Sequence, residues 1–276
     1  MLRRLIRWGY RRLLHPSARN SLQLTLLLAE HDRALEPITD FTASRVLVLA
    51  PHMDDEVIGC GGVVARHVAA GARVAVAYMT DGRGSASFPP VVTGAEIAAN
   101  RLEVCATRRR EAHAAAAILG IEELYFLDAA DGSLRPDDVV VEALARRVTE
   151  LRPEIIYLPF AMDMHGDHWQ TNLVFAACVD RLPPALLQHA LCRGYEVGTP
   201  AVANRLADIT AVMDVKRAAL RAFPSQLEHK DYVRCVEGLN AYRSITFGRG
   251  RGYAEAFHES SVAAYRELLR RATSGR

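Results

Sequence analysis

From Arg45 onward, short apolar runs alternate with longer segments of helical periodicity. The apolar runs have the length of buried strands and lie at 46–50, 74–79, 123–127 and 154–158. The segments between and after them are typical of helices and lie at 57–70, 95–119, 137–151 and 169–180. Gly120 directly follows the second of these, where a helix C-cap is expected. This alternation predicts an α/β fold with a Rossmann-like, mainly parallel sheet flanked by helices.

The carboxy-terminal part is less regular. Residues 190–197 are typical of a strand and 208–223 of a helix, and the remainder is mostly helical with a loop around 247–253. We therefore expect this half to add helices and a further strand or two. The polar segment 80–94 contains Gly and Pro and is long for a tight connection, so we expect it to face a substrate.

Length and composition predict one large domain. The chain has 276 residues, 50% of them apolar, which is enough to bury a sizeable core. Its formal net charge is +2, but six arginines and no acidic residue lie in residues 1–20, which leaves −4 on the rest. Nucleic-acid binding as the main function is therefore not expected.

The amino terminus forms a separate prediction. Residues 1–40 are expected to be a basic amphipathic extension and residues 41–276 the main domain. Arginines alternate with apolar side chains over residues 1–14, as in a helix that lies on an anionic membrane or in one that is solvated or packed on a partner. Both interpretations stay open. No apolar stretch approaches the ~18 residues of a membrane span, so we predict a cytoplasmic protein with a possible peripheral membrane contact through residues 1–20.

The five cysteines do not suggest a disulfide framework. They include no C-x-x-C pair, and their number is odd. We expect small buried side chains in a reducing compartment. Cys60, about one turn into the helix after the first motif, is expected to pack rather than to bind metal.

Two clusters of His and acidic residues follow predicted strands. The segment Pro51-His52-Met53-Asp54-Asp55-Glu56 comes directly after the run 46–50, and His165-Gly166-Asp167-His168 comes after the run 154–158. Open α/β sheets bind their ligands at the carboxyl ends of the strands, so we expect the clusters to meet. A hydrolytic zinc ion usually takes three protein ligands, often two His and a carboxylate, with a second carboxylate nearby as base. The sequence therefore predicts a metal site.

Purely structural interpretations exist for single residues of these clusters. Acidic residues before a helix commonly cap it, and capping is the favoured interpretation for Glu56. A histidine such as His52, taken alone, is more often a hydrogen-bonded structural residue than a ligand. Two such clusters at the ends of two predicted central strands are harder to explain by structure alone.

These motifs resemble the LmbE/PIG-L family of zinc-dependent N-acetylglucosaminyl deacetylases. The resemblance covers roughly residues 45–259 and is anchored in the two clusters. Weaker similarities are Thr80-Asp81-Gly82, Arg110-Glu111 with Leu119-Gly120, Asp131-Gly132, Lys216 with Ser225-Gln226, and Tyr253-Ala254-Glu255-Ala256-Phe257. The family usually has Pro where this chain has Met53, a residue that shapes the loop and is not a ligand.

The resemblance implies a role for each site residue. His52, Asp55 and His168 are similar to the zinc ligands, and Asp54 to the general base that deprotonates the metal-bound water. His165 is similar to the histidine that stabilises the oxyanion and protonates the leaving amine, with Asp167 orienting it. A structural role for His165 stays open.

The implied reaction is hydrolysis of an acetyl or other acyl group from an N-acylated amino sugar conjugate, a step in glycoconjugate biosynthesis. Arg83 and Arg110 are candidates for contacts with sugar hydroxyls or a phosphate, and surface or structural salt bridges are at least as good an explanation for both. A non-sugar amide is an alternative substrate, and iron or cobalt an alternative to zinc.

Two motifs are also compatible with other classes of function. A His52-x-Asp54 motif with a distant His is also compatible with the facial triad of a non-haem iron oxygenase, but that triad usually lies in an antiparallel barrel. The cluster Gly59-Cys60-Gly61-Gly62 suggests a nucleotide-binding module, yet it lacks the G-x-G-x-x-G spacing and follows an acidic turn. Close packing of the helix explains these glycines better.

Overall fold

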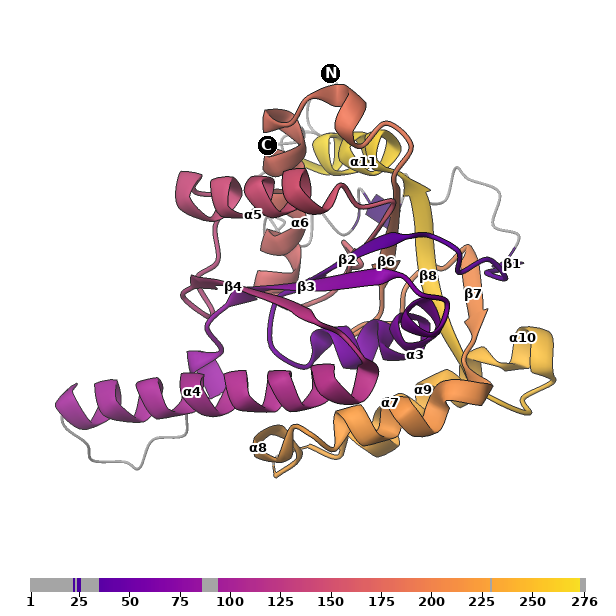
Figure 1. Cartoon of the computed structure of the whole chain (residues 1–276), viewed down its shortest axis with the longest axis horizontal. Helices are drawn as coiled ribbons and strands as arrows, with labels where there is room; N and C mark the ends of the chain where they lie inside the picture. The colour runs from indigo at the N-terminus through magenta and orange to yellow at the C-terminus, as the bar shows by residue number, and fades with distance from the viewer. Residues whose placement is uncertain (1–21, 23, 26–34, 86–93, 229, 274–276) are drawn as a thin grey trace, which may run out of the picture.

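The computed structural model describes residues 22, 24–25, 35–85, 94–228 and 230–273, and these form a sheet with helices on both faces (Figure 1). The strand order is β1-β7-β8-β6-β5-β2-β3-β4. The strands span β1 Glu36–Pro37, β2 Arg45–Ala50, β3 Arg73–Thr80, β4 Glu123–Ala129, β5 Ile155–Pro159, β6 Leu191–Tyr195, β7 Arg205–Asp208 and β8 Ala254–Ser261. Within the group β2, β3, β4, β5 and β6, all neighbouring strands pair in parallel. Strand β8 runs antiparallel to β6 and β7. The predicted fold class is confirmed.

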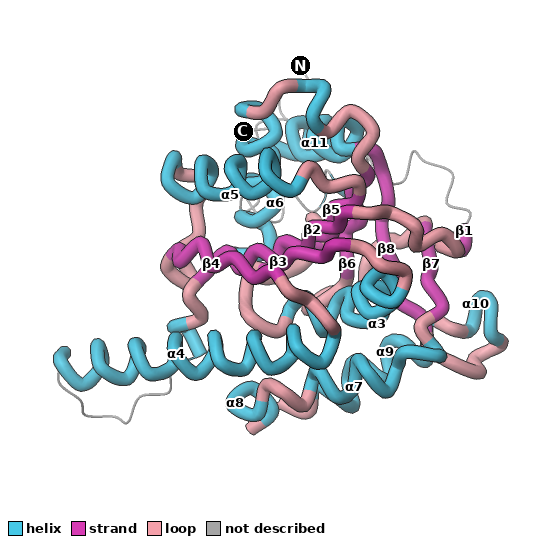
Figure 2. The backbone as a smooth tube through the Cα atoms, in the orientation of Figure 1, coloured by secondary structure: helices cyan, strands magenta, loops and turns pink. Residues whose placement is uncertain are grey.

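The helices form a layer on each face of the sheet. The α-helices span α3 Asp55–Ala69, α4 Gly94–Leu119, α5 Asp138–Leu151, α6 Gly166–Arg181, α7 Met213–Leu220, α8 Pro224–Leu227, α9 Tyr232–Arg243, α10 Ile245–Gly248 and α11 Val262–Thr273. Short 3₁₀ turns lie at Arg83–Ser85, Pro184–Leu186 and Thr210–Val212. Helices α5, α6 and α11 lie on one side of the strands, and α3, α4 and α7 lie on the other (Figure 2).

Alternation along each central strand divides its side chains between two cores. In β2, Val46, Val48 and Ala50 pack in the core beneath α3 and α4, whereas Leu47 and Leu49 pack in the core beneath α5 and α6. Successive side chains of a strand point to opposite faces, so a strand covered on both sides must be apolar throughout. This is why the central strands could be predicted as continuous apolar runs.

The order in which the chain adds strands to the sheet changes direction at β2. From β2 it proceeds through α3 to β3 and through α4 to β4, and then α5 carries it back to β5 on the other side of β2. The carboxyl ends of β2 and β5 therefore lie at a topological switch point, where open α/β sheets form a binding crevice. The loops that follow these two strands carry the two predicted clusters.

Three expectations need correction or refinement. Residues 205–208 form β7, so the helix expected from 208 is α7 and begins at Met213. Residues 254–261 form β8 instead of belonging to a mostly helical remainder. Ile38 and Phe41 are buried in the core and β1 pairs with β7, so we propose that the catalytic domain begins before residue 41.

The predicted amphipathic helix at residues 1–14 lies outside the described residues. Among the described residues, no helix is both long and apolar enough to cross a bilayer.

Candidate metal centre

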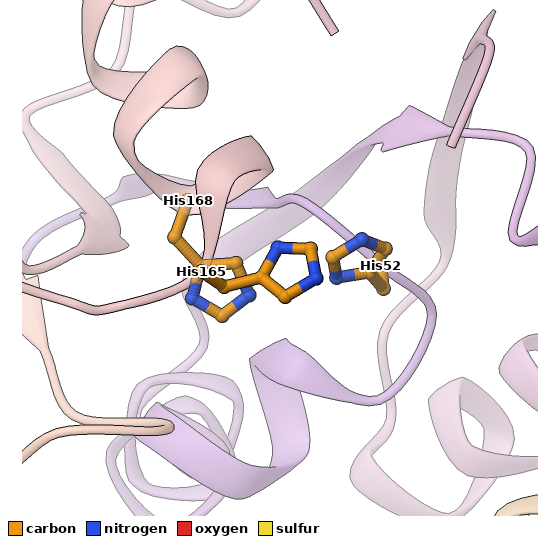
Figure 3. A group of neighbouring side chains, drawn as sticks. All are labelled: His52, His165 and His168. Atoms are coloured by element: carbon orange, nitrogen blue, oxygen red, sulfur yellow. The ribbon is translucent and has the colours of Figure 1, made fainter. Parts of the chain in front are cut away.

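The two predicted clusters meet at the switch point. His52 lies in the turn between β2 and α3, and His165 and His168 lie at the N-terminus of α6, which follows β5 (Figure 3). The ring centroids of His52 and His165 are 4.7 Å apart, those of His165 and His168 are 5.0 Å apart, and those of His52 and His168 are 5.4 Å apart. One nitrogen from each of the three rings lies within 4.8 Å of the others. Side chains separated by more than a hundred residues therefore form one site.

Asp55 lies between two of these imidazoles. Its Oδ2 is 3.1 Å from Nδ1 of His52 and 3.3 Å from Nε2 of His168. The backbone N–H of His52 also donates to this oxygen, at 2.8 Å. Zinc bound tetrahedrally at about 2.1 Å holds neighbouring ligand atoms about 3.4 Å apart. The distances from Asp55 to His52 and to His168, and the donor types of the three residues, fit such an ion.

The other ring nitrogen of each histidine faces an outer carboxylate. Nδ1 of His168 lies 3.3 Å from Oδ1 of Asp163, and Nε2 of His52 lies 3.2 Å from Oδ1 of Asp131 and 3.4 Å from Oδ2 of Asp167. A metal-binding histidine commonly presents its second nitrogen to a carboxylate, which fixes the tautomer and the ring orientation. Both rings meet this condition.

The charges of the cluster favour a bound cation. Burial opposes the charged form of His52 and of His168, but contacts with Asp131, Asp167 and Asp55 hold the pKa of His52 well above its usual value. Coulombic attraction to Asp55 and contacts with Asp163 raise the pKa of His168 to about 9. The carboxylates thus stabilise positive charge at the two histidines. A divalent ion would provide that charge in place of the protons on the rings.

Asp54 is held beside the cluster by a buried arginine. Its Oδ1 lies 3.3 Å from Nη2 of Arg108, and Arg108 also donates to the carbonyl of Met53. Burial raises the pKa of Asp54 to about 6. The positive charge of Arg108 opposes this rise, and the negative charge of Asp55 adds to it. Asp54 has a φ of 151°, a conformation that non-glycine residues adopt at a cost of about 1–3 kcal/mol and that occurs mostly at functional sites.

His165 lies at the exposed side of the cluster. It is the N-cap of α6, and its Nδ1 accepts the backbone N–H of Asp167 at 3.2 Å. A neutral imidazole that accepts at Nδ1 carries its proton on Nε2. Burial and the neighbouring His52 lower the pKa of His165, so the neutral ring prevails at neutral pH.

Asp167 differs in part from expectation. Its backbone orients His165, but its carboxylate accepts the N–H groups of Gly132 at 2.7 Å and Leu134 at 3.2 Å and faces His52. The carboxylate of Asp167 therefore links the loop at residues 132–134, which precedes α5, to His52. It does not bond the His165 ring.

The two arginines expected to contact substrate differ in their distance from the cluster, and their contacts with a substrate stay predictions. Arg83 lies near the site, since it bonds Asp81, which also accepts the N–H of Asp131. Arg110 is exposed on α4 and bonds Thr107 of its own helix. Positions i and i+2 of an α-helix point about 200° apart around its axis. Arg108 therefore faces the site, and Arg110 faces solvent.

The contacts of Glu56 and Cys60 support the fold and do not involve the proposed metal ligands. Glu56 is buried, accepts the Tyr78 hydroxyl at 2.8 Å and the Asp54 N–H at 3.1 Å, and therefore supports the start of α3, in line with the favoured capping interpretation. Cys60 is buried and its thiol donates to the carbonyl of Glu56.

The contacts of Asp131, Asp163 and Arg108 with the cluster were not predicted from the sequence. Asp131 belongs to the Asp131-Gly132 pair, which is one of the weaker family similarities, so the sequence did contain a signal for its role. Asp163 had none, because its contact with His168 depends on the path of the loop after β5.

Comparisons with known proteins relate the chain to one family. The family model of PIG-L, described as GlcNAc-PI de-N-acetylase, matches residues 47–179. A probable N-acetyl-α-D-glucosaminyl L-malate deacetylase 2 of Bacillus cereus is 30% identical over 193 residues, which are 66% of this chain and 84% of the relative. The diacetylchitobiose deacetylase of Thermococcus kodakarensis is 29% identical over 234 residues, which are 80% and 84% of the two chains.

A solved structure shows the same fold. The N,N′-diacetylchitobiose deacetylase from Pyrococcus horikoshii superimposes with a TM-score of 0.68 at 23% identity, covering 88% of this chain and 91% of that one. The fold and the mainly parallel sheet give no support to the antiparallel barrel of a non-haem iron oxygenase. On the sequence similarity and the shared fold, the chain belongs to the PIG-L/LmbE family, whose matched relatives are deacetylases.

Proposed function

We propose that this protein is a zinc-dependent hydrolase that removes an acetyl group from an N-acetylated amino sugar conjugate. One observation carries the metal assignment: His52 and His168 each turn one ring nitrogen to Asp55 and the other to an outer carboxylate. The substrate class rests on the relatives, which act on N-acetylated glucosamine compounds by their names.

In this proposal His52, Asp55 and His168 hold the ion. When bound, it would polarise the amide carbonyl and lower the pKa of a water molecule. Iron or cobalt would suit the same ligands, so zinc is the specific hypothesis to be tested.

Asp54 acts as the proton acceptor. It lies next to Asp55 in the chain but is paired with Arg108, so its carboxylate is left outside the proposed ligand set. It takes the proton of the attacking water and passes it on as the amide bond breaks.

His165 acts on the charge that develops on the reacting group. Because its Nδ1 accepts the Asp167 N–H, its Nε2–H is free to donate to the oxygen of the tetrahedral intermediate. The proton that Asp54 takes from the water goes to the departing amine, so that acetate and a free amino sugar are the products, and His165 keeps its own Nε2 proton. Arg83, near Asp131 at the rim, is the better placed candidate for a contact with sugar hydroxyls or a phosphate.

The test is release of acetate and amine by chelator-treated protein before and after zinc is restored. The substrates are N-acetylglucosamine conjugates, with N-acetyllysine as a non-sugar amide. The proposal expects activity on the sugars only, and only with metal. Equal turnover of N-acetyllysine would assign the enzyme to other amides, and activity in the absence of metal would contradict zinc dependence.

A further inference from the structure

Helix α3 contains a break directly behind the proposed metal centre. Cys60 has φ −145° and ψ 16°, so the helix consists of a short first piece, residues 55–59, and a longer second piece. The first piece begins with Asp55 and follows the loop that carries His52 and Asp54. A break frees backbone N–H and C=O groups that a continuous helix would pair.

A buried ion pair occupies this break. Lys216 of α7 and Glu255 of β8 are joined at 2.6 Å, and their side chains are 0% and 1% exposed. Glu255 accepts the N–H of Gly62 at 2.7 Å and that of Val63 at 2.8 Å, and Lys216 donates to the carbonyl of Ile58 at 2.9 Å.

The charges are placed to suit the two helix pieces. The carboxylate lies at the N-terminus of the second piece, and the ammonium lies at the C-terminus of the first. Each charge is opposite to the local end of the helix dipole. An apolar pair of similar volume is often at least as stable as a buried ion pair, but it could not bond the free groups of the break.

The glycine cluster allows this close approach. A Cβ on Gly59 would lie 2.1 Å from Cδ2 of Tyr195, and one on Gly62 would lie 2.6 Å from Cγ2 of Ile209. A Cβ on Gly61 would lie 3.3 Å from Cγ1 of Val57 and 3.4 Å from Cγ of Lys216, so this position is less tightly packed. The expectation that the glycines serve close packing is confirmed at Gly59 and Gly62.

Hydrogen bonds connect the pair to the proposed site through a single residue. Lys216 binds the carbonyl of Ile58, and the N–H of Ile58 donates to the carbonyl of Asp54 at 2.9 Å. Movement of the first piece relative to Lys216 would therefore move Asp54 and Asp55 together.

We propose that Lys216 and Glu255 are positioning residues that fix the first piece of α3, and with it Asp55, in the geometry that binds the metal. This inference rests on the proposed function. Neither residue touches the reacting groups, and both act through the backbone of Ile58, Gly62 and Val63.

The test compares two isosteric variants on the same strand. Glu255→Gln disrupts the pair at the break, and Glu259→Gln is the matched control. Glu259 is a partly buried residue of the same strand, and its carboxylate binds two arginines outside α3, Arg193 at 2.7 Å and Arg205 at 2.8 Å.

The readouts are the zinc affinity, measured by competition with a chelator, and the visible spectrum of the cobalt-substituted protein, which reports ligand geometry. Supporting groups around metal ligands typically contribute about 10- to 100-fold in affinity. We expect a loss of about that size and an altered cobalt spectrum for Glu255→Gln, and unchanged values for Glu259→Gln, even where both variants lower the melting temperature.

Wild-type affinity and spectrum in Glu255→Gln would overturn the positioning role and leave the pair as a support of the fold alone. If Glu255→Gln does not fold, Glu255→Asp, which keeps the charge but shortens its reach, is subject to the same two criteria. Failure of the wild-type protein itself to bind zinc or cobalt would refute the proposed function, and the positioning role with it. Metal binding and hydrolysis by the wild type with an unaffected variant would refute only the positioning role.

Discussion

The buried histidine of α3 predicts how stability depends on pH. His67 is fully buried, and its Nε2 lies 3.0 Å from the Tyr157 hydroxyl. Burial, reinforced by the nearby positive charges of Arg193 and Arg66, lowers its pKa from 6.5 to about 4. As the pH falls below 6.5, the unfolded chain binds a proton at this position and the folded protein does not. Folding therefore loses stability as the pH falls, until the folded pKa is reached.

The size of this effect follows from the two pKa values. One pKa unit corresponds to about 1.4 kcal/mol. Linkage between 6.5 and about 4 predicts a loss of about 2 kcal/mol between pH 7 and pH 5, and of about 3 kcal/mol by pH 4. Other groups titrate in the same range, so the quantity to compare is the difference between wild type and a His67→Gln variant.

The assay is urea unfolding of both proteins at pH 7, 6, 5 and 4.5. Glutamine can still bond the Tyr157 hydroxyl but does not titrate. We expect the wild type to lose about 2 kcal/mol more than the variant between pH 7 and pH 5. Parallel curves for the two proteins would show that the pKa of His67 is not depressed and would refute the reasoning.

Three further predictions concern the site and the amino terminus. His165→Ala should lower kcat by about 100-fold or more while zinc remains bound; loss of the metal would instead identify His165 as a ligand. Arg108→Met should lower the free energy of unfolding by about 3 kcal/mol, since it leaves buried Asp54 unpaired, whereas Arg110→Met should change it by less than about 0.5 kcal/mol; equal effects in urea titrations would contradict the assignment of Arg108 to the site. Deletion of residues 1–20 should abolish co-sedimentation with anionic vesicles, and unchanged sedimentation would exclude a role for this segment in membrane contact.

The central strands were predictable because both of their faces are covered. The runs at β2, β3 and β5 are apolar throughout, and the period of two appears only when their residues are assigned to the two cores. Strand β8 was not recognised, because its second half is polar and Glu255 interrupts the apolar first half. Glu255 is buried through its ion pair with Lys216, 39 residues away in the sequence, and through the N–H groups of Gly62 and Val63. Such a partner cannot be found from local periodicity.

The site was predictable to the extent that topology determines it. Two clusters at the carboxyl ends of neighbouring parallel strands must lie close together, and His52 and His168 do. The outer carboxylates were not identified, because loop conformation brings Asp131 and Asp163 to the histidines. The choice between Arg108 and Arg110 depended on the rotation of α4 about its own axis, which the weak amphipathic pattern of that helix does not fix.

The most direct test of the account combines metal analysis and turnover on the same samples of wild type and Asp54→Asn. We measure bound zinc per chain and acetate release from an N-acetylglucosamine conjugate. The account predicts one zinc per chain in both proteins, with turnover lower by at least about 100-fold in the variant. Undiminished turnover in Asp54→Asn, or turnover by a wild-type protein that holds no metal, would contradict it.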